Sequence, residues 1–169
     1  MKPEQLQKFY DMAEPRSEEA IRKAEERKTK RKDKELLLKD LCARFPYGVK
    51  FKWCDGYHDG YYTFIGINEQ YIVGRSTDGY QVGFIIGMDD IKPYLRPMSS
   101  MTEEEHNEWF NYYHEIELKE TKSTGDYLKA AILGESASID WLNKNMFDFR
   151  GLIPKDLALS TDEFNPYKE

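Results

Sequence analysis

The amino-acid sequence predicts an α+β fold, in which helices pack on a small curled antiparallel sheet of four to five strands. Between Tyr47 and Met88, four short apolar and aromatic runs alternate with turn signals, which is the pattern of a β-meander. Segments with helical periodicity lie on both sides of this region. Gly74, Gly83 and Gly87 allow tight curvature or close approach of the backbone. We therefore expect an SH3-like partial barrel.

The chain is expected to have three parts. Residues 1–35 form a charged and mostly solvated N-terminal helical arm, residues 36–159 form the α+β domain, and residues 160–169 form a loose tail. Within the domain, the sheet covers about 47–97 and a helical part covers about 99–159. A chain of 169 residues is long enough for one domain with its own core and such an appendage.

The predicted arm helix begins at Ser17, a residue type favoured at helix N-caps, and continues to Lys34. It is rich in Glu, Lys, Arg and Ala, and pairs of opposite charge four residues apart stabilise it: Glu18–Arg22, Glu19–Lys23 and Glu26–Lys30. A second helical segment, from Glu35 to Phe45, has a wide apolar stripe. We expect this stripe to dock on the sheet; it comprises Leu36, Leu37, Leu38, Leu41 and Cys42.

Four segments are predicted as strands, separated by turns rich in Gly, Asp and Asn. In Val49–Trp53, apolar residues alternate with Lys50 and Lys52, as in a half-buried strand. The others cover residues 61–67, 71–74 and 80–87, and residues 91–97 form an extended exit from the sheet.

Three helices are predicted after the sheet. Thr102 and Glu105 form a capping box that begins a helix through about Lys119. Residues 126–133 form a second helix that Gly134 ends, and residues 138–146 form a short third helix.

Charge is distributed unevenly along the chain. The net charge is −6, but residues 22–34 carry eight basic and three acidic groups, whereas residues 99–169 carry seven basic and fifteen acidic groups. This asymmetry favours a charged partner, or attraction between the two ends within or between chains.

Several features predict a cytoplasmic protein that does not bind membranes. The first ten residues lack the apolar core of a signal peptide, and no stretch is apolar enough for a membrane span. Cys42 and Cys54 lack C-x-x-C spacing, so free thiols in a reducing compartment are the simpler interpretation.

The sequence has no residue pattern that indicates catalysis or a metal centre. His106 and His114 are about two helical turns apart, too far to share one ion without a third element. The Glu103-x-x-His106 spacing has no second copy, and His58 lies between Asp55 and Asp59 in a predicted turn. We expect surface histidines, no metal, no cofactor and no catalytic residue. An enzyme whose site is assembled only in space is the second alternative.

Nucleic-acid binding is the first alternative. The basic run could lie along phosphates with Arg27, Lys28, Lys30, Arg31 and Lys32. Aromatic residues of the sheet could stack on bases, although the signatures of an RNA-recognition module are absent. The opposing interpretation is a solvated helix beside aromatic residues that fill a core.

Binding of a protein partner, without enzymatic activity, is the leading hypothesis. A curled sheet with an aromatic rim, flanked by helices that carry Trp109 and Trp141, offers the residue types enriched in interface hot spots. The opposing interpretation is that these rings fill the core. The candidate partner-binding residues are Tyr57, Tyr61, Tyr62, Tyr71 and Trp109. The sequence specifies neither the partner nor the oligomeric state.

Three blocks of sequence carry a resemblance to known proteins. They are residues 38–50 (LKDLCARFPYGVK), residues 91–104 (IKPYLRPMSSMTEE), and residues 140–153, which include DWLN and FDFRGLI. In these blocks the chain resembles a family of small uncharacterised proteins from gut bacteria, their phages and mobile elements. The resemblance implies a cytoplasmic accessory protein of a phage or mobile element. Phage accessory proteins often act by binding host machinery, including defence systems, so we expect a modulator of host machinery, for example an inhibitor of a defence system.

Overall fold

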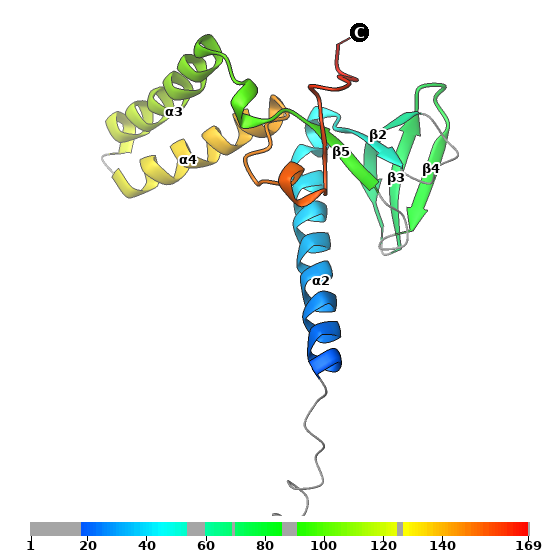
Figure 1. The fold of residues 1–169 in the computed structure, drawn as a ribbon. Coiled ribbons are helices and arrows are strands. Elements are labelled where there is room, and N and C mark those ends of the chain that lie inside the picture. Colours follow the sequence, from blue (N-terminus) through cyan, green and yellow to red (C-terminus); the bar gives the residue numbers. More distant parts are fainter. Residues whose placement is uncertain (1–17, 54–59, 69, 86–90, 125–126, 169) are drawn as a thin grey trace, which may run out of the picture. The chain divides into compact units, whose positions relative to one another are not determined.

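The computed structural model of the protein describes residues 18–53, 60–68, 70–85, 91–124 and 127–168 (Figure 1). The chain divides into two units, Met1–Leu36 and Leu37–Glu169. The second unit has an α+β architecture, as the sequence predicted. Every helix in the described residues is too short or too polar to cross a lipid bilayer.

Helix α2 (Glu18–Arg44) is one continuous helix where the sequence predicted two segments. No glycine or proline lies between residues 18 and 44, so nothing breaks the helix where the arm ends. Within the arm, Lys23 pairs with Glu19 (2.6 Å) and Arg31 pairs with Glu35 (3.3 Å). The first of these pairs is a predicted one.

The last turns of α2 are packed, as the apolar stripe predicted. Leu41 is fully buried, and Leu37 and Leu38 pack against the same core cluster. Cys42 is exposed, so its assignment to the stripe was wrong. Each residue turns the helix by about 100°, so Cys42 points away from the side on which Leu41 is buried.

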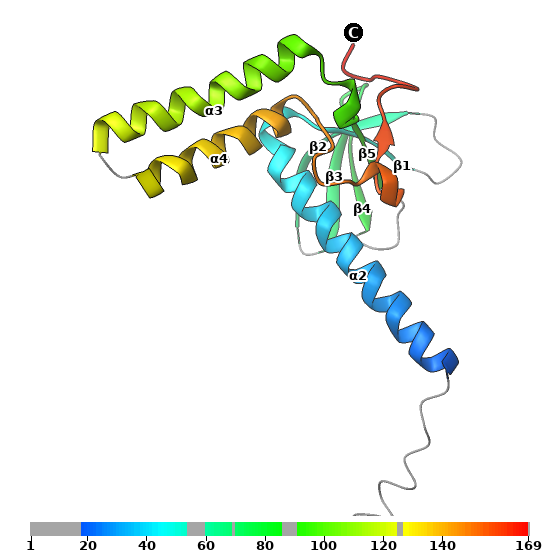
Figure 2. The ribbon, with the colours of Figure 1, turned by 60° about the vertical axis from the view of Figure 1, so that its left-hand side comes forward.

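Six strands of the described residues form one open sheet in the order β4-β3-β2-β1-β5-β6 (Figures 1 and 2). The predicted antiparallel meander is confirmed by β1 (Lys50–Trp53), β2 (Tyr61–Ile67), β3 (Tyr71–Ser76) and β4 (Gln81–Ile85). Strand β5 (Ile91–Leu95) returns to the other edge of β1 and pairs with it antiparallel. Strand β6 (Leu159–Ser160) adds a parallel pairing with β5. The sheet is therefore mixed, with more strands than predicted.

One face of the meander forms the main core with the end of α2. The Phe84 ring meets the rings of Phe51 and Tyr62 edge to face, at centroid distances of 5.3 and 4.9 Å. Gly74 lets β3 pass this cluster, because a Cβ there would lie 2.7 Å from Cζ of Phe51. The prediction that Gly74 serves a close approach is confirmed. The buried cluster comprises Leu41, Val49, Phe51, Tyr62, Phe64, Ile72, Phe84, Ile91 and Met146.

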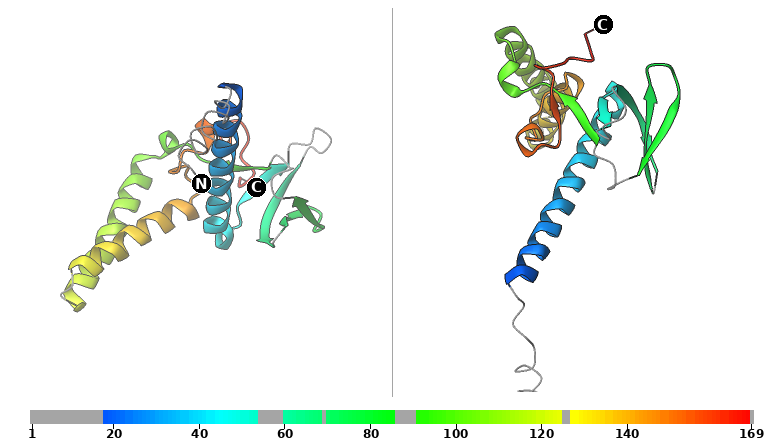
Figure 3. Two further views of the ribbon diagram at one scale, coloured as in Figure 1. Left: turned by 90° about the horizontal axis from the view of Figure 1, so that it is seen from below. Right: turned by 45° about the vertical axis from the view of Figure 1, so that its right-hand side comes forward.

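Helices α3 (Glu103–Thr124) and α4 (Tyr127–Lys144) run side by side as a hairpin (Figures 2 and 3). The predicted capping box begins α3: the Glu105 N–H donates to Oγ1 of Thr102 (3.2 Å), and the Thr102 N–H donates to Oε2 of Glu105 (3.0 Å). The predicted helix end at Gly134 was wrong, because α4 continues through it. A Cβ at Gly134 would lie 3.0 Å from Cε2 of Tyr113, so this glycine serves close packing of the two helices.

The C-terminal segment is packed, although the sequence predicted a loose tail from residue 160. It follows the short helix η3 (Ile153–Lys155) and strand β6. Thr161 and Pro166 are buried. The Tyr167 hydroxyl accepts a hydrogen bond from the Lys50 N–H (2.9 Å) and donates one to the carbonyl of Tyr94 (3.0 Å). Residues 160–168 are therefore held by backbone groups of β1 and β5.

Candidate functional site

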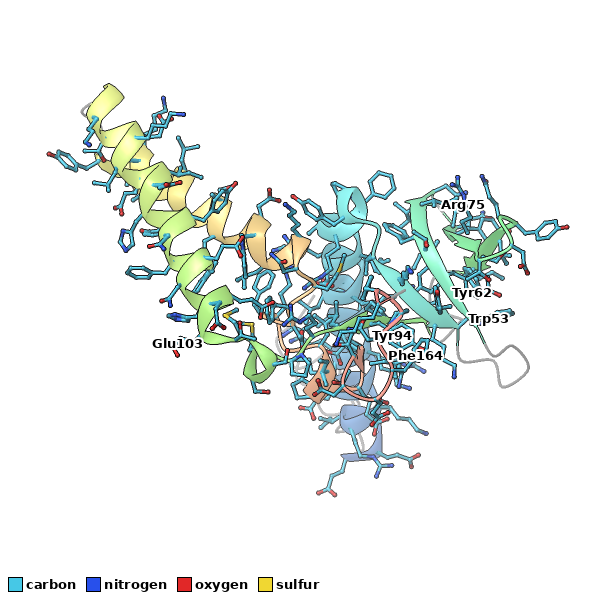
Figure 4. The ribbon with its side chains drawn as sticks, turned by 90° about the horizontal axis from the view of Figure 1, so that it is seen from above. Trp53, Tyr62, Arg75, Tyr94, Glu103 and Phe164 are labelled. Atoms are coloured by element: carbon cyan, nitrogen blue, oxygen red, sulfur yellow. The ribbon has the colours of Figure 1, made fainter. Side chains whose placement is uncertain are left out.

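The structure separates the predicted partner-binding residues. Tyr61 and Tyr62 are neighbours on β2, and so they face opposite sides of the sheet. Tyr62 is buried in the main core (Figure 4) and is not available to a partner. Tyr71 is exposed on β3, whereas Trp109 is half-buried on α3. Tyr57 lies outside the described residues.

Rings on the outer face of the sheet hold the C-terminal segment. Phe164 lies beside Tyr94 (Figure 4), with ring centroids 5.6 Å apart, and 6.1 Å from the ring of Tyr61. Lys50 donates from Nζ to the carbonyl of Pro166 (2.6 Å) and lies 4.7 Å from the centroid of Tyr61. Tyr61 therefore contributes to packing of the chain's own C-terminal segment.

The predicted nucleic-acid-binding residues all lie on the exposed part of α2. None of the five is buried, and Arg31 pairs with the nearby carboxylate of Glu35 while its side chain stays 79% exposed. The arm is therefore a solvated cationic helix. Both nucleic-acid binding and a purely solvating role require this property. The five residues are Arg27, Lys28, Lys30, Arg31 and Lys32.

The described histidines do not converge with other ligating groups. His106 is exposed, and Nδ1 of His114 lies 3.5 Å from Oε2 of Glu117. Glu103 is exposed at the start of α3 (Figure 4). Within the described parts of the chain, no group of three or more His, Cys, Asp or Glu residues could hold a metal ion. Four predicted candidates lie outside those parts: Cys54, Asp55, His58 and Asp59.

The most deeply buried charges form a polar joint between α2 and the end of α4, made by Asp40, Arg44, Asn143, Phe147 and Arg150. Arg44 donates to both carboxylate oxygens of Asp40 (2.7 and 3.0 Å) and to the carbonyl of Phe147 (2.7 Å). Arg150 donates to Asp40 (2.7 Å) and to Oδ1 of Asn143 (2.9 Å). Among the described residues, every buried side-chain nitrogen and oxygen has a partner. The joint is therefore structural and presents no free group to a ligand.

A polar cleft of about 760 Å³ lies beside this joint, and two of its charged side chains, Arg96 and Glu105, form an ion pair with each other. Arg96 donates twice to Glu105 (2.7 and 2.9 Å), and this contact lowers the pKa of Glu105. A hydrogen bond from Tyr47 to Asp140 raises the pKa of Tyr47 to about 12. A hydroxyl with that pKa is a poor proton donor or acceptor near neutral pH. The described lining includes neither histidine nor cysteine.

The α3–α4 hairpin buries one row of side chains from each helix. Nε1 of Trp109 donates to Oγ of Ser138 (2.6 Å), and the ring of Tyr113 packs against Gly134. These two contacts set which residues of the antiparallel helices lie level with each other. At the base of the hairpin, Trp141 stacks on Phe147, with ring centroids 5.8 Å apart.

Many of the other apolar side chains of the hairpin face solvent. Eight large ones in its described residues are between 37% and 77% exposed. Single exposed apolar residues are normal, but contiguous apolar surface marks an interaction site. The eight are Phe110, Tyr112, Leu118, Tyr127, Leu128, Ile132, Leu133 and Ile139.

One side of the hairpin is hollowed into a groove of about 390 Å³, which we call the hairpin groove. Tyr112 and Leu133 contribute exposed apolar surface to it from the two helices, at 41% and 37% exposure. Its lining comprises Tyr112, Ile116, Lys119 and Glu120 from α3, with Leu133, Ser136, Ala137 and Asp140 from α4.

The opposite side carries a second apolar surface, which we call the hairpin face: Phe110, Leu118, Leu128, Ile132 and Ile139. Phe110 and Leu118 are eight residues apart, with His114 between them, so they share one side of α3. Leu128, Ile132 and Ile139 are separated by four and seven residues, so they share one side of α4. Around each helix, the side chains that contact the other helix lie between those of the hairpin groove and those of the hairpin face. The groove and the face are therefore on opposite sides of the hairpin.

The two helices of the hairpin differ in charge. Helix α3 has seven glutamates and two lysines, a net charge of −5. Helix α4 has two acidic and two basic residues and is neutral overall. The hairpin therefore presents apolar surface beside an acidic helix.

The exposed hairpin residues were missed at the level of sequence, although α4 contained a signal for them. Besides the residues that pack on α3, α4 has large aliphatic side chains on a second side, at Leu128, Ile132 and Ile139. A helix that is apolar on more than one side needs more than one packing partner. Splitting this segment at Gly134 hid the pattern.

Comparison of the chain with models of known protein families, with curated proteins and with solved structures found no match.

Proposed function

We propose that this protein is a non-enzymatic binding protein whose α3–α4 hairpin docks a protein partner. The observation that carries this proposal is the apolar surface that the two helices leave exposed after packing on each other. The buried core of a protein interface is apolar, and a few anchors in it, aromatic ones above all, supply most of the binding free energy. The leading hypothesis from the sequence is thus retained, while its site moves from the aromatic residues of the sheet to the hairpin.

The hairpin groove suits an amphipathic helix of the partner. Two antiparallel helices leave a groove along their axes, and the ridge of a third helix packs into such a groove. A volume of about 390 Å³ accommodates a few anchoring side chains. The net charge of −5 on α3 favours a partner helix with lysine or arginine beside its apolar anchors.

The family resemblance gives this proposal a specific form: a cytoplasmic accessory protein of a phage or mobile element that modulates host machinery, such as an inhibitor of a defence system. The sheet then serves as the scaffold. The return of β5 to the edge of β1 supports an SH3-like curl of the first five strands.

Affinity capture from cells of the encoding organism, followed by titration with the purified captured protein, tests the proposal. Tyr112→Ala and Leu133→Ala should each weaken binding by about thirtyfold, the effect of losing one hot-spot residue. Ile85→Ala is the matched control, because Ile85 is 43% exposed on β4. Equal affinity of all three variants and the wild type would refute docking in the hairpin groove.

Nucleic-acid binding by the arm is the second candidate, favoured by the exposure of its basic side chains. Binding through phosphates should weaken steeply with salt. Replacing Lys30, Arg31 and Lys32 together by glutamine should reduce the slope of log K against log salt concentration by about 2–3. A slope unchanged by the triple substitution would exclude the arm as the contact.

A further inference from the structure

We infer that the hairpin face is the interface of a homodimer, in which two hairpins form a four-helix bundle. This interface lies on the side opposite the hairpin groove, so it goes beyond the function proposed above. A two-helix hairpin has one buried row per helix, whereas each helix of a four-helix bundle packs against two neighbours. A second copy supplies the missing neighbours with the same surface, which is the isologous contact of a twofold dimer.

The apolar area available matches what a stable dimer needs. The five side chains of the hairpin face are 44% to 73% exposed. At roughly 100 Å² of exposed surface each, they provide roughly 500 Å² per copy. A standard interface buries about 800 Å² per partner, of which about 57–65% is apolar, or about 460–520 Å². Complete burial of these five side chains would therefore supply the apolar part of a standard interface.

Two hairpin faces can pack on each other with the twofold axis perpendicular or parallel to the helices, and the charges of the helices favour one of these arrangements. A twofold axis perpendicular to the helices would place α3 of one copy against α3 of the other, each with a net charge of −5. A twofold axis parallel to the helices places α3 against the neutral α4 of the other copy. Like charges across an interface are unfavourable, so the second arrangement is preferred. Neighbouring helices are then antiparallel, as in up-down four-helix bundles.

The polar residues on the face are complementary in this arrangement. Tyr113 packs against Gly134 and the helices are antiparallel, so His114 lies level with Leu133 and about 3 Å along the helix axis from the level of Glu135. Glu135 is exposed on the same side of α4 as Leu128 and Ile139. The imidazole of one copy therefore faces the Glu135 carboxylate of the other, and the twofold axis repeats this pair. The dimer also leaves two hairpin grooves on opposite outer sides, which makes it bivalent for the partner.

Sedimentation equilibrium of the full chain tests the dimer. The wild type should have a mass of about 40 kDa, twice the chain mass of 20.0 kDa. Leu128→Glu with Ile132→Glu should give a monomer with an unchanged circular dichroism spectrum. Ile67→Glu is the matched control, because Ile67 is 43% exposed at the end of β2, and it should stay dimeric. A wild type that is monomeric up to its solubility limit would overturn the inference, and so would a dimer that the double substitution leaves intact.

A charge exchange tests the stacking arrangement. His114→Glu and Glu135→His should each raise the dissociation constant of the dimer by about tenfold, and the two together should restore it. Failure of the double variant to recover would refute the arrangement with α3 against α4. Tyr112→Ala, in the hairpin groove, should leave the dimer intact, so loss of partner binding and loss of dimerisation are separate results.

Discussion

Replacing Arg44 by methionine should destabilise the domain strongly. The guanidinium is fully buried and donates to both oxygens of Asp40 and to the carbonyl of Phe147. Methionine keeps much of the volume, but it leaves the Phe147 carbonyl with only the Phe149 N–H as donor (3.0 Å), and it leaves Asp40 with Arg150 as its remaining charged partner in the polar joint. Removing one partner of a buried ion pair costs about 3–5 kcal/mol. That is a large share of the roughly 5–15 kcal/mol that stabilises an ordinary domain.

Urea denaturation followed by tryptophan fluorescence measures this loss. Trp53 lies in the sheet, whereas Trp109 and Trp141 lie in the hairpin, so one signal reports on both regions. Arg31→Met is the matched control: its ion pair with Glu35 is exposed and should contribute at most about 1 kcal/mol. A loss below about 1 kcal/mol for Arg44→Met would refute the role assigned to the polar joint.

Three further outcomes follow from single contacts. Tyr167→Phe should lower the free energy of unfolding by about 1–3 kcal/mol in urea denaturation, because the Lys50 N–H and the Tyr94 carbonyl each lose a hydrogen bond. Burial raises the pKa of the Tyr167 hydroxyl above its ordinary value of 10.0. The hydroxyl therefore makes its full contribution to the free energy of unfolding below pH 10, and this contribution is lost as the pH rises through the folded-state pKa. The phenylalanine variant should lack this loss of stability at alkaline pH. The hydrogen bonds from Arg96 lower the pKa of Glu105 below its ordinary value of 4.5. The ion pair therefore stabilises the fold above pH 4.5, and this stabilisation is lost as the pH falls through the folded-state pKa. Glu105→Gln should reduce the dependence of the free energy of unfolding on pH in the acid range. Gly134→Val should cost about 1–3 kcal/mol and speed hydrogen exchange in α3 and α4, since even a Cβ would crowd Tyr113.

The elements that the sequence predicted well are those set by nearby residues. The four meander strands follow from two-residue periodicity and their turns, and the start of α3 follows from the capping box of Thr102 and Glu105. Gly134 misled the prediction because a glycine ends helices in isolated sequence. Here its missing side chain makes room for Tyr113 from another helix.

The features that were missed depend on residues far apart in the chain. The return of β5 to β1, the addition of β6 and the packing of Tyr167 are pairings between distant segments. The polar joint likewise brings Asp40 to Arg150 across 110 residues. Local periodicity has no access to such contacts, so the sequence predicted an extended exit and a loose tail instead.

The sequence also had no way to tell which aromatic residues of the sheet are buried. The tyrosines of the sheet belong to the residue types found in hot spots, but the same rings fill small cores. Tyr62 does so, and Tyr61 packs near the C-terminal segment. Only the tertiary structure shows that the apolar side chains left over after packing lie on α3 and α4.

The exposed hairpin side chains add little to the stability of the fold, and this supports the proposal that they serve binding. The main core and the polar joint are complete without them, since none of the five residues of the hairpin face belongs to a buried cluster among the described residues. Exposed apolar surface favours aggregation unless something covers it. Charged substitutions at Leu128 and Ile132 should therefore change the free energy of unfolding by no more than about 0.5 kcal/mol in the monomer. Because such variants keep the fold, any interaction that they lose can be assigned to the hairpin face itself.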